Sequence, residues 1–221
     1  MPCPSIDLDP MNTLQTSYAN AVLGADFATL ENIHQPSKNI AIYQREIHHL
    51  QADLAVTNTQ HLAFQSAGAV VDVLQELNAY FSEHLPTCHR LLEDITNTFL
   101  QFEKITRSDS LKLMLTTVDT NMCRKFHTDI NDLRLLCTYV GPGTLWVPNE
   151  AVHELPHATG GRARELAIDE AHIQQVVTGD IVVLKGALYP QSNPILHRSP
   201  AIEACGEQRL MLRMDVNESL T

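Results

Sequence analysis

The spacing of apolar residues along the chain changes character near residue 108. Before this point, apolar residues recur at helical spacing over 69–81 and again in the segment that follows the Pro86-Thr87 pair, which predicts two amphipathic helices. A further helix is expected over 44–54, and a short β-like run at 39–43 precedes it. We therefore expect residues 1–108 to be mostly helical, with one short strand.

Beyond residue 108 the period falls to about two, and Gly, Pro, Asn and Asp residues separate short apolar runs. Many short strands joined by such turns are typical of a sandwich or barrel and not of a sheet that alternates strands with helices. We therefore expect an α+β chain in which the helical half packs on a β core of residues 109–221, as one compact unit. The expected strands are 111–118, 124–129, 133–140, 144–147, 173–177, 181–185, 194–198 and 208–216.

Charge and composition narrow the classes of partner. No apolar run is long enough to span a membrane, and the first residues lack the basic and apolar regions of a secretory signal, so we expect a cytoplasmic protein without membrane contact. The net charge of −11 repels phosphate backbones, which favours a small-molecule or protein substrate over nucleic acid. The five cysteines include no C-x-x-C pair, so we expect mostly buried thiols in a reducing compartment.

The candidate chemistry centres on the H-x-D pair of His127 and Asp129. In an extended segment, side chains two residues apart face the same side, so this imidazole and carboxylate would project together. His197, near the end of the β region, can supply a third ligand. Two imidazoles and one carboxylate on one face of a metal form the facial triad of non-haem Fe(II) oxygenases. Taken alone, the pair also fits a carboxylate that orients a surface histidine.

The order of the surrounding features strengthens the metal interpretation. An apolar strand, a Gly-Pro-Gly turn, the single Trp, a long loop, a Gly-Asp turn, His197 and a final strand with arginines follow the H-x-D pair in that order. Over about residues 110–216 this order resembles the Fe(II)/2-oxoglutarate-dependent dioxygenases. The resemblance implies a double-stranded β-helix core (jelly-roll, cupin-like) that binds Fe(II) through His127, Asp129 and His197. Three motifs more narrowly resemble a bacterial family classed as a domain of unknown function: 124–129, 178–182 and 197–200.

By that resemblance, 2-oxoglutarate is the co-substrate and an arginine soon after the second histidine holds its C5 carboxylate. A guanidinium suits this task because it donates two parallel charged hydrogen bonds. Arg209 and Arg213 have the same parity on the last strand, and Arg209 is favoured because it follows a hairpin. Arg213 fits equally well as a surface residue paired with Asp215.

Thr138 and Trp146 are candidates to line the co-substrate pocket, although a Trp within a barrel is more commonly a core residue. Three functions stay open. The first is an Fe(II)/2-oxoglutarate-dependent hydroxylase or demethylase. The second is a non-catalytic cupin-like protein that binds Zn(II) or another divalent ion in metal homeostasis, which the high histidine content favours. The third is a metal-independent interaction domain whose helical half forms a homodimer surface.

Overall fold

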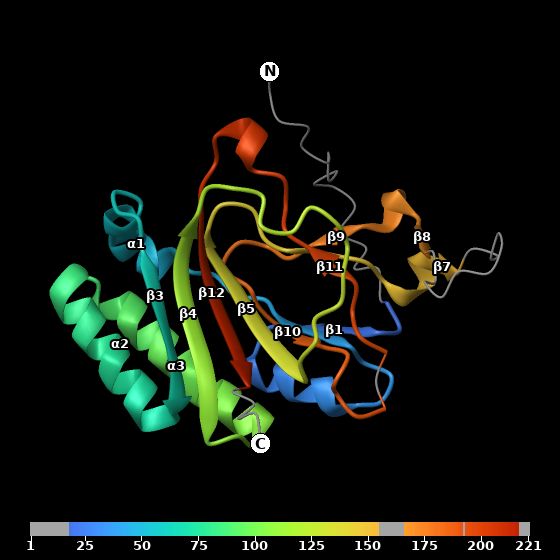
Figure 1. Cartoon of the computed structure of the whole chain (residues 1–221), viewed down its shortest axis with the longest axis horizontal. Helices are drawn as coiled ribbons and strands as arrows, with labels where there is room; N and C mark the ends of the chain where they lie inside the picture. The colour runs from blue at the N-terminus through green and yellow to red at the C-terminus, as the bar shows by residue number, and fades with distance from the viewer. Residues whose placement is uncertain (1–17, 155–165, 192, 217–221) are drawn as a thin grey trace.

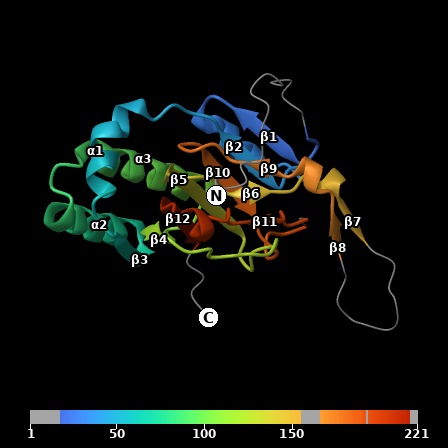
Figure 2. The ribbon, with the colours of Figure 1, turned by 90° about the horizontal axis from the view of Figure 1, so that it is seen from above.

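The computed structural model describes residues 18–154, 166–191 and 193–216 as a mixed α+β fold. Three helices gather at one end of the molecule, and a two-stranded pair projects at the other end (Figures 1 and 2). The helices are α1 (Gln51–Thr57), α2 (Val70–His84) and α3 (His89–Thr106). The strands are β1 (Ala21–Gly24), β2 (Ile40–Tyr43), β3 (Ala63–Ala69), β4 (Ser110–Val118), β5 (Leu133–Val140), β6 (Leu145–Trp146), β7 (Val152–Glu154), β8 (Leu166–Ile168), β9 (Gln174–Gln175), β10 (Ile181–Lys185), β11 (His197–Arg198) and β12 (Arg209–Val216).

A seven-stranded sheet in the order β1-β2-β10-β5-β12-β4-β3 forms the centre of the fold. Only β1 and β2 are parallel, and every other neighbouring pair in this sheet is antiparallel. A smaller sheet has the order β11-β6-β9, and β7 pairs with β8. This arrangement gives a large and a small sheet, as a jelly-roll core requires.

Alternate residues of the central strands face two separate cores, because successive side chains of a strand point to opposite faces. On β5, Leu135, Cys137 and Tyr139 join the core beneath α2 and α3. Leu136 faces the other way, into a second core between the two sheets that also contains Trp146. The inner face of the large sheet is therefore the surface on which the site residues of β5 and β12 lie.

The expectation of a mostly helical region 1–108 with one short strand is not supported by residues 18–108, the part of it that the structure describes. This region supplies β1, β2 and β3 to the large sheet, and of these only β2 coincides with the expected run at 39–43. The strand β3 is an edge strand whose sequence, AFQSAGA, contains one large apolar residue, so its period-two signal is weak. The strand β1 is only four residues long.

The helix expected over 44–54 is wrong for residues 44–47, which are not helical; a 3-10 helix (His48–Leu50) follows them and leads into α1 at Gln51. Tertiary contacts hold Arg45, within this first part, in its non-helical conformation. The backbone N–H of Arg45 donates to Asp180 Oδ1 at 3.1 Å, and its guanidinium forms a two-point ion pair with Asp94 on α3. The two long helices are confirmed, at α2 and α3.

The strands expected at 111–118, 133–140, 181–185 and 208–216 are confirmed to within one residue. The strand expected at 124–129 is not formed. Within the described residues, Cys88, Cys123 and Cys137 are free thiols, but Cys205 is disulfide-bonded, which departs from the expected thiols. None of the described helices has the length and apolar character needed to cross a membrane.

Candidate metal centre

Two histidines from distant segments meet at an isolated β-bridge. The backbone N–H of His127 donates to the carbonyl of His197 at 3.0 Å, and the reverse hydrogen bond has the same length. Residues that face each other across an antiparallel bridge present their side chains on one face. The two imidazole centroids are accordingly 4.7 Å apart. His197 also pairs with Trp146 in β6, so the small sheet anchors this bridge.

A backbone carbonyl two residues earlier orients each ring. The Nδ1 atom of His127 lies 3.1 Å from the carbonyl oxygen of Lys125, and that of His197 lies 3.3 Å from the carbonyl of Ile195. Because a carbonyl only accepts, Nδ1 carries the proton of each neutral ring and the Nε2 lone pair is left for a ligand. This is the arrangement that metal-binding histidines adopt.

The carboxylate of Asp129 faces both Nε2 atoms. Its oxygens lie 3.7 Å from His127 Nε2 and 3.3 Å from His197 Nε2. Asp129 and His197 are buried, and His127 is partly exposed. Asp129 Oδ2 is buried and accepts no hydrogen bond, which is expected when neither Nε2 carries a proton.

Three lone-pair donors thus converge, with one ligand atom from each residue within 4.8 Å of the others. Burying such acceptors without a partner is unfavourable, whereas a divalent cation between them would satisfy all three. The residues therefore fit the expected metal, and they satisfy the geometric condition that the sequence pattern set for His127, Asp129 and His197.

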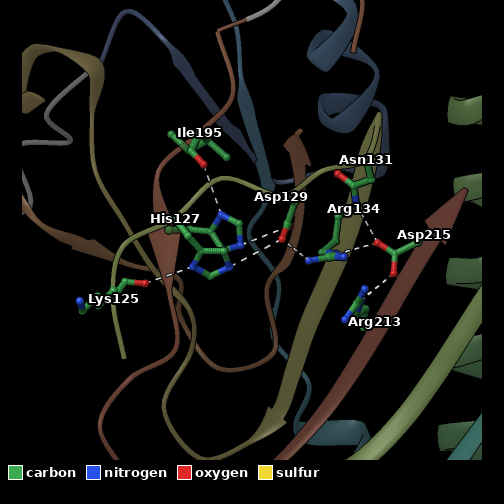
Figure 3. A network of polar contacts seen from close by, with 9 residues as sticks. Lys125, His127, Asp129, Asn131, Arg134, Ile195, Arg213 and Asp215 are labelled. Atoms are coloured by element: carbon green, nitrogen blue, oxygen red, sulfur yellow. Dashed lines mark hydrogen bonds and ion pairs between the residues drawn. The ribbon is translucent and has the colours of Figure 1, made fainter. Parts of the chain in front are cut away.

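A network of charged residues behind Asp129 fixes its carboxylate (Figure 3). Arg134 contacts Asp129 Oδ1 through Nη1 at 2.5 Å and Asp215 Oδ1 through Nε at 2.6 Å. Asp215 also accepts from Asn131 at 2.9 Å and from Arg213 Nε at 2.6 Å. Arg134 therefore links the candidate ligand to a second buried carboxylate.

The electrostatics of this network favour the ionised carboxylate. Burial of Asp129 raises its pKa, but the close contact with His197 lowers it, and Arg134 and His127 lower it further. The net result is a pKa of Asp129 below its usual value. The carboxylate is therefore an anionic ligand at neutral pH, as a metal site requires.

Arg209 lies further along the same inner face, and its surroundings are unusual for a charged group. Its side chain is 1% exposed, and its Nη2 donates to Thr138 Oγ1 at 3.0 Å. Its Nε has no acceptor, and no carboxylate pairs with this guanidinium among the residues that the structure describes. Burial alone lowers the pKa of Arg209 to about 10. A buried cation without an anion is a candidate site for an anionic ligand.

A cavity of about 60 Å³ is lined by two of the candidate ligands, His127 and His197. Leu136, Met211 and Arg213 are also among its walls. Arg213 is therefore close to the triad. Its Nε donates to Asp215, which agrees with the alternative role expected from the sequence, an arginine paired with Asp215. On the same face, Thr138 is two residues from Leu136 along β5, and Arg209 is two residues from Met211 along β12. Thr138 and Arg209 therefore lie about 7 Å along their strands from residues that line this cavity.

Trp146 is placed differently from Thr138. It is 3% exposed and packs edge to face on Tyr18, with ring centroids 5.6 Å apart, in the core between the sheets. These contacts favour the core role that was the alternative for this residue.

The sequence reasoning missed Arg134 and Asp215 as supports of the site. A charged residue flanked by leucines in an alternating strand, as Arg134 is in β5, was the available signal.

The chain belongs to the family described as a protein of unknown function (DUF1826), whose model matches residues 24–215. This confirms the expected resemblance to a domain-of-unknown-function family. No curated protein sequence matches the chain.

Among solved structures, the chain is similar to the dioxygenase for auxin oxidation from Arabidopsis thaliana in complex with 2-oxoglutarate. The TM-score is 0.52 at 8% identity, over 90% of this chain and 92% of that one. A full-length protein of Neurospora crassa in complex with alpha-KG gives 0.41 at 10% identity, over 89% and 83%. A prolyl-4-hydroxylase of Pseudomonas putida gives 0.36 at 13% identity, over 80% and 98%. The first of these supports the double-stranded β-helix fold and, at this identity, shows the fold alone.

Proposed function

We propose that this protein is an Fe(II)/2-oxoglutarate-dependent oxygenase. His127, Asp129 and His197 would hold Fe(II), and Arg209 would bind the C5 carboxylate of 2-oxoglutarate. The observation that carries the proposal is the buried guanidinium of Arg209, which has no anionic partner among the described residues and lies on the same inner face as the triad network. A metal site alone would not require such a residue.

When bound, Fe(II) and 2-oxoglutarate would supply the oxidising chemistry, and the residues of the chain would bind, orient and shield. The carbonyls of Lys125 and Ile195 fix the tautomers of His127 and His197, and Arg134 holds the carboxylate of Asp129 in place. Thr138 orients the guanidinium of Arg209 through its hydroxyl. The apolar side chains of this face exclude water from the reacting groups.

The substrate of the proposed oxygenase would be a small molecule or a protein. The net charge of −11 disfavours nucleic acid as a general partner. Met122, Cys123 and Ser199 also line the small cavity beside His127 and His197, and they lie in segments outside the large sheet. Loop segments on a rigid scaffold are where substrate specificity usually resides, so we expect these residues to face the substrate.

The test is an anaerobic titration of the purified protein with Fe(II) and then 2-oxoglutarate. We expect a weak visible metal-to-ligand absorption band in the wild type. His127→Ala should lose the band because it loses a ligand, and Arg209→Met should keep Fe(II) but bind 2-oxoglutarate much more weakly. Arg90→Met removes an exposed arginine and is the matched control that should behave as wild type.

A non-catalytic zinc-binding protein would use the same three ligands. It predicts tight binding of Zn(II), no absorption band with 2-oxoglutarate and identical behaviour of wild type and Arg209→Met. This outcome would reject the oxygenase proposal and retain the metal site. Failure of any divalent ion to bind would reject both.

A further inference from the structure

A second cavity, of about 530 Å³, lies apart from the three candidate metal ligands, none of which lines it. Its volume falls within the range of small-molecule sites in proteins. Pro36, Leu133 and Val216 give it apolar walls, and polar groups come from several elements. The polar wall residues used below are His34, Asp132, Lys185 and Tyr189.

Lys185 is an unusual residue for the wall of an apolar cavity, because it is 2% exposed at the end of the central strand β10. Its Nζ donates to the carbonyl of Gln35 at 3.0 Å and lies 4.5 Å from the ring centroid of Tyr189. Within the described ranges, no carboxylate lies at ion-pair distance from this ammonium. Burial lowers the pKa of Lys185, so these two contacts do not fully compensate the hydration that the ammonium loses.

His34 and Tyr189 already have hydrogen-bond partners. His34 Nε2 lies 2.9 Å from the carbonyl of Ile105, so this nitrogen carries the proton. His34 Nδ1 then accepts the hydroxyl proton of Tyr189 across 2.8 Å. Since the Tyr189 hydroxyl donates to His34, it is not free to donate to a ligand. The ammonium of Lys185 is the donor on this wall that still lacks an anion.

We infer that this cavity binds a small molecule with one carboxylate and an apolar body. The carboxylate would pair with Lys185, and the apolar part would pack on Pro36, Leu133 and Val216. Asp132 also lines the cavity, and its carboxylate repels a second negative charge, which favours a monocarboxylate over a dicarboxylate. This separates the ligand class from 2-oxoglutarate, the co-substrate proposed for the other site.

The cavity shares a wall with the loop that carries Asp129. The turn that follows Lys185 donates three backbone hydrogen bonds to this loop: Gly186 N–H to Asp132 at 2.8 Å, Ala187 N–H to Asp129 at 2.8 Å and Leu188 N–H to Asn131 at 3.0 Å. Gly186 is required for this approach, because a Cβ there would lie 2.1 Å from the carbonyl oxygen of Asn131. The ligand would therefore sit beside the metal centre without entering it.

The test uses the metal-free full chain, so that its result does not depend on the proposed oxygenase activity. Isothermal titration with hexanoate should give saturable binding, and hexanamide, its uncharged isostere, should bind at least about tenfold more weakly because it cannot pair with the ammonium. Acetate, which lacks the apolar body, should also bind more weakly. Absence of saturable hexanoate binding, or equal binding of hexanamide, would overturn the inference.

Lys185→Met keeps the length of the side chain and removes the charge. We expect hexanoate binding to weaken at least about tenfold, while the melting temperature without ligand rises because an uncompensated buried charge is gone. Lys104→Met, at an exposed position of α3, is the control and should leave binding unchanged. If Lys185→Met lowers the melting temperature and retains binding, Lys185 is a structural residue and the inference is wrong. The comparison of hexanoate with hexanamide on the wild type stands even if this variant does not fold.

Discussion

Replacement of Arg209 by Met separates a functional arginine from a structural one. In the structure this guanidinium is almost fully buried, with one hydrogen bond to Thr138 and no acceptor at Nε. A structural arginine would stabilise the fold, so its loss would lower stability. An arginine retained to bind a carboxylate costs stability until the ligand arrives, so its loss should raise the stability of the free protein.

The pKa gives the magnitude of this cost. Burial lowers the pKa of Arg209 from the usual value of a guanidinium to about 10. At about 1.4 kcal/mol per pKa unit, the buried charge destabilises the folded state by about 3 kcal/mol at neutral pH. Loss of the hydrogen bond to Thr138 destabilises the variant by about 1 kcal/mol, which reduces this gain. Since Met keeps most of the apolar volume, we expect Arg209→Met to be more stable than wild type by about 2 kcal/mol.

Urea denaturation without and with saturating 2-oxoglutarate is the assay, and both proteins carry the same divalent ion. We expect 2-oxoglutarate to stabilise the wild type and not the variant. The stability advantage of Arg209→Met over the wild type should therefore shrink or reverse when the co-substrate is present. Arg213→Met is the contrast, because Arg213 is paired with Asp215 and its removal should destabilise the protein and retain the response. The reasoning would be refuted if Arg209→Met were destabilised and still responded to 2-oxoglutarate.

Three further outcomes test other parts of the structure. Zn(II) should raise the melting temperature of the wild type and have little effect on Asp129→Asn, which loses the anionic ligand; an equal rise in both would exclude Asp129 from the metal site. Arg134→Leu leaves the carboxylates of Asp129 and Asp215 without their shared guanidinium, and chemical denaturation should show a loss of about 3 kcal/mol in the metal-free protein. Burial raises the pKa of Cys137 to about 12, so its thiolate is scarce at pH 8. Iodoacetamide at this pH should therefore modify the half-buried Cys123 first. Mass spectrometry that found Cys137 modified first in the native protein would contradict this.

The sequence determined the features that depend on local burial. The long strands β4, β5 and β12 carry polar residues at alternating positions among apolar ones because each separates two environments, and this pattern is visible in the chain. The strand β10 is visible as an apolar run that is buried throughout. The two long helices carry apolar residues at helical spacing for the same reason. The H-x-D pair and the later histidine were visible because metal ligands come from few residue types.

The tertiary structure decided what depends on partners far away in the chain. The strands β1 and β3 join the large sheet through pairing with distant strands, and their own sequences are too short or too poor in large apolar residues to predict this. His127 reaches His197 through a single backbone bridge and not through a regular strand. Whether a charged side chain is paired also depends on its neighbours in space. Arg213 has a carboxylate and the buried Arg209 has none among the described residues, although both arginines belong to the same strand. A charge pattern along one dimension cannot encode that difference, because hydration and ion pairing are set by the three-dimensional surroundings of each group.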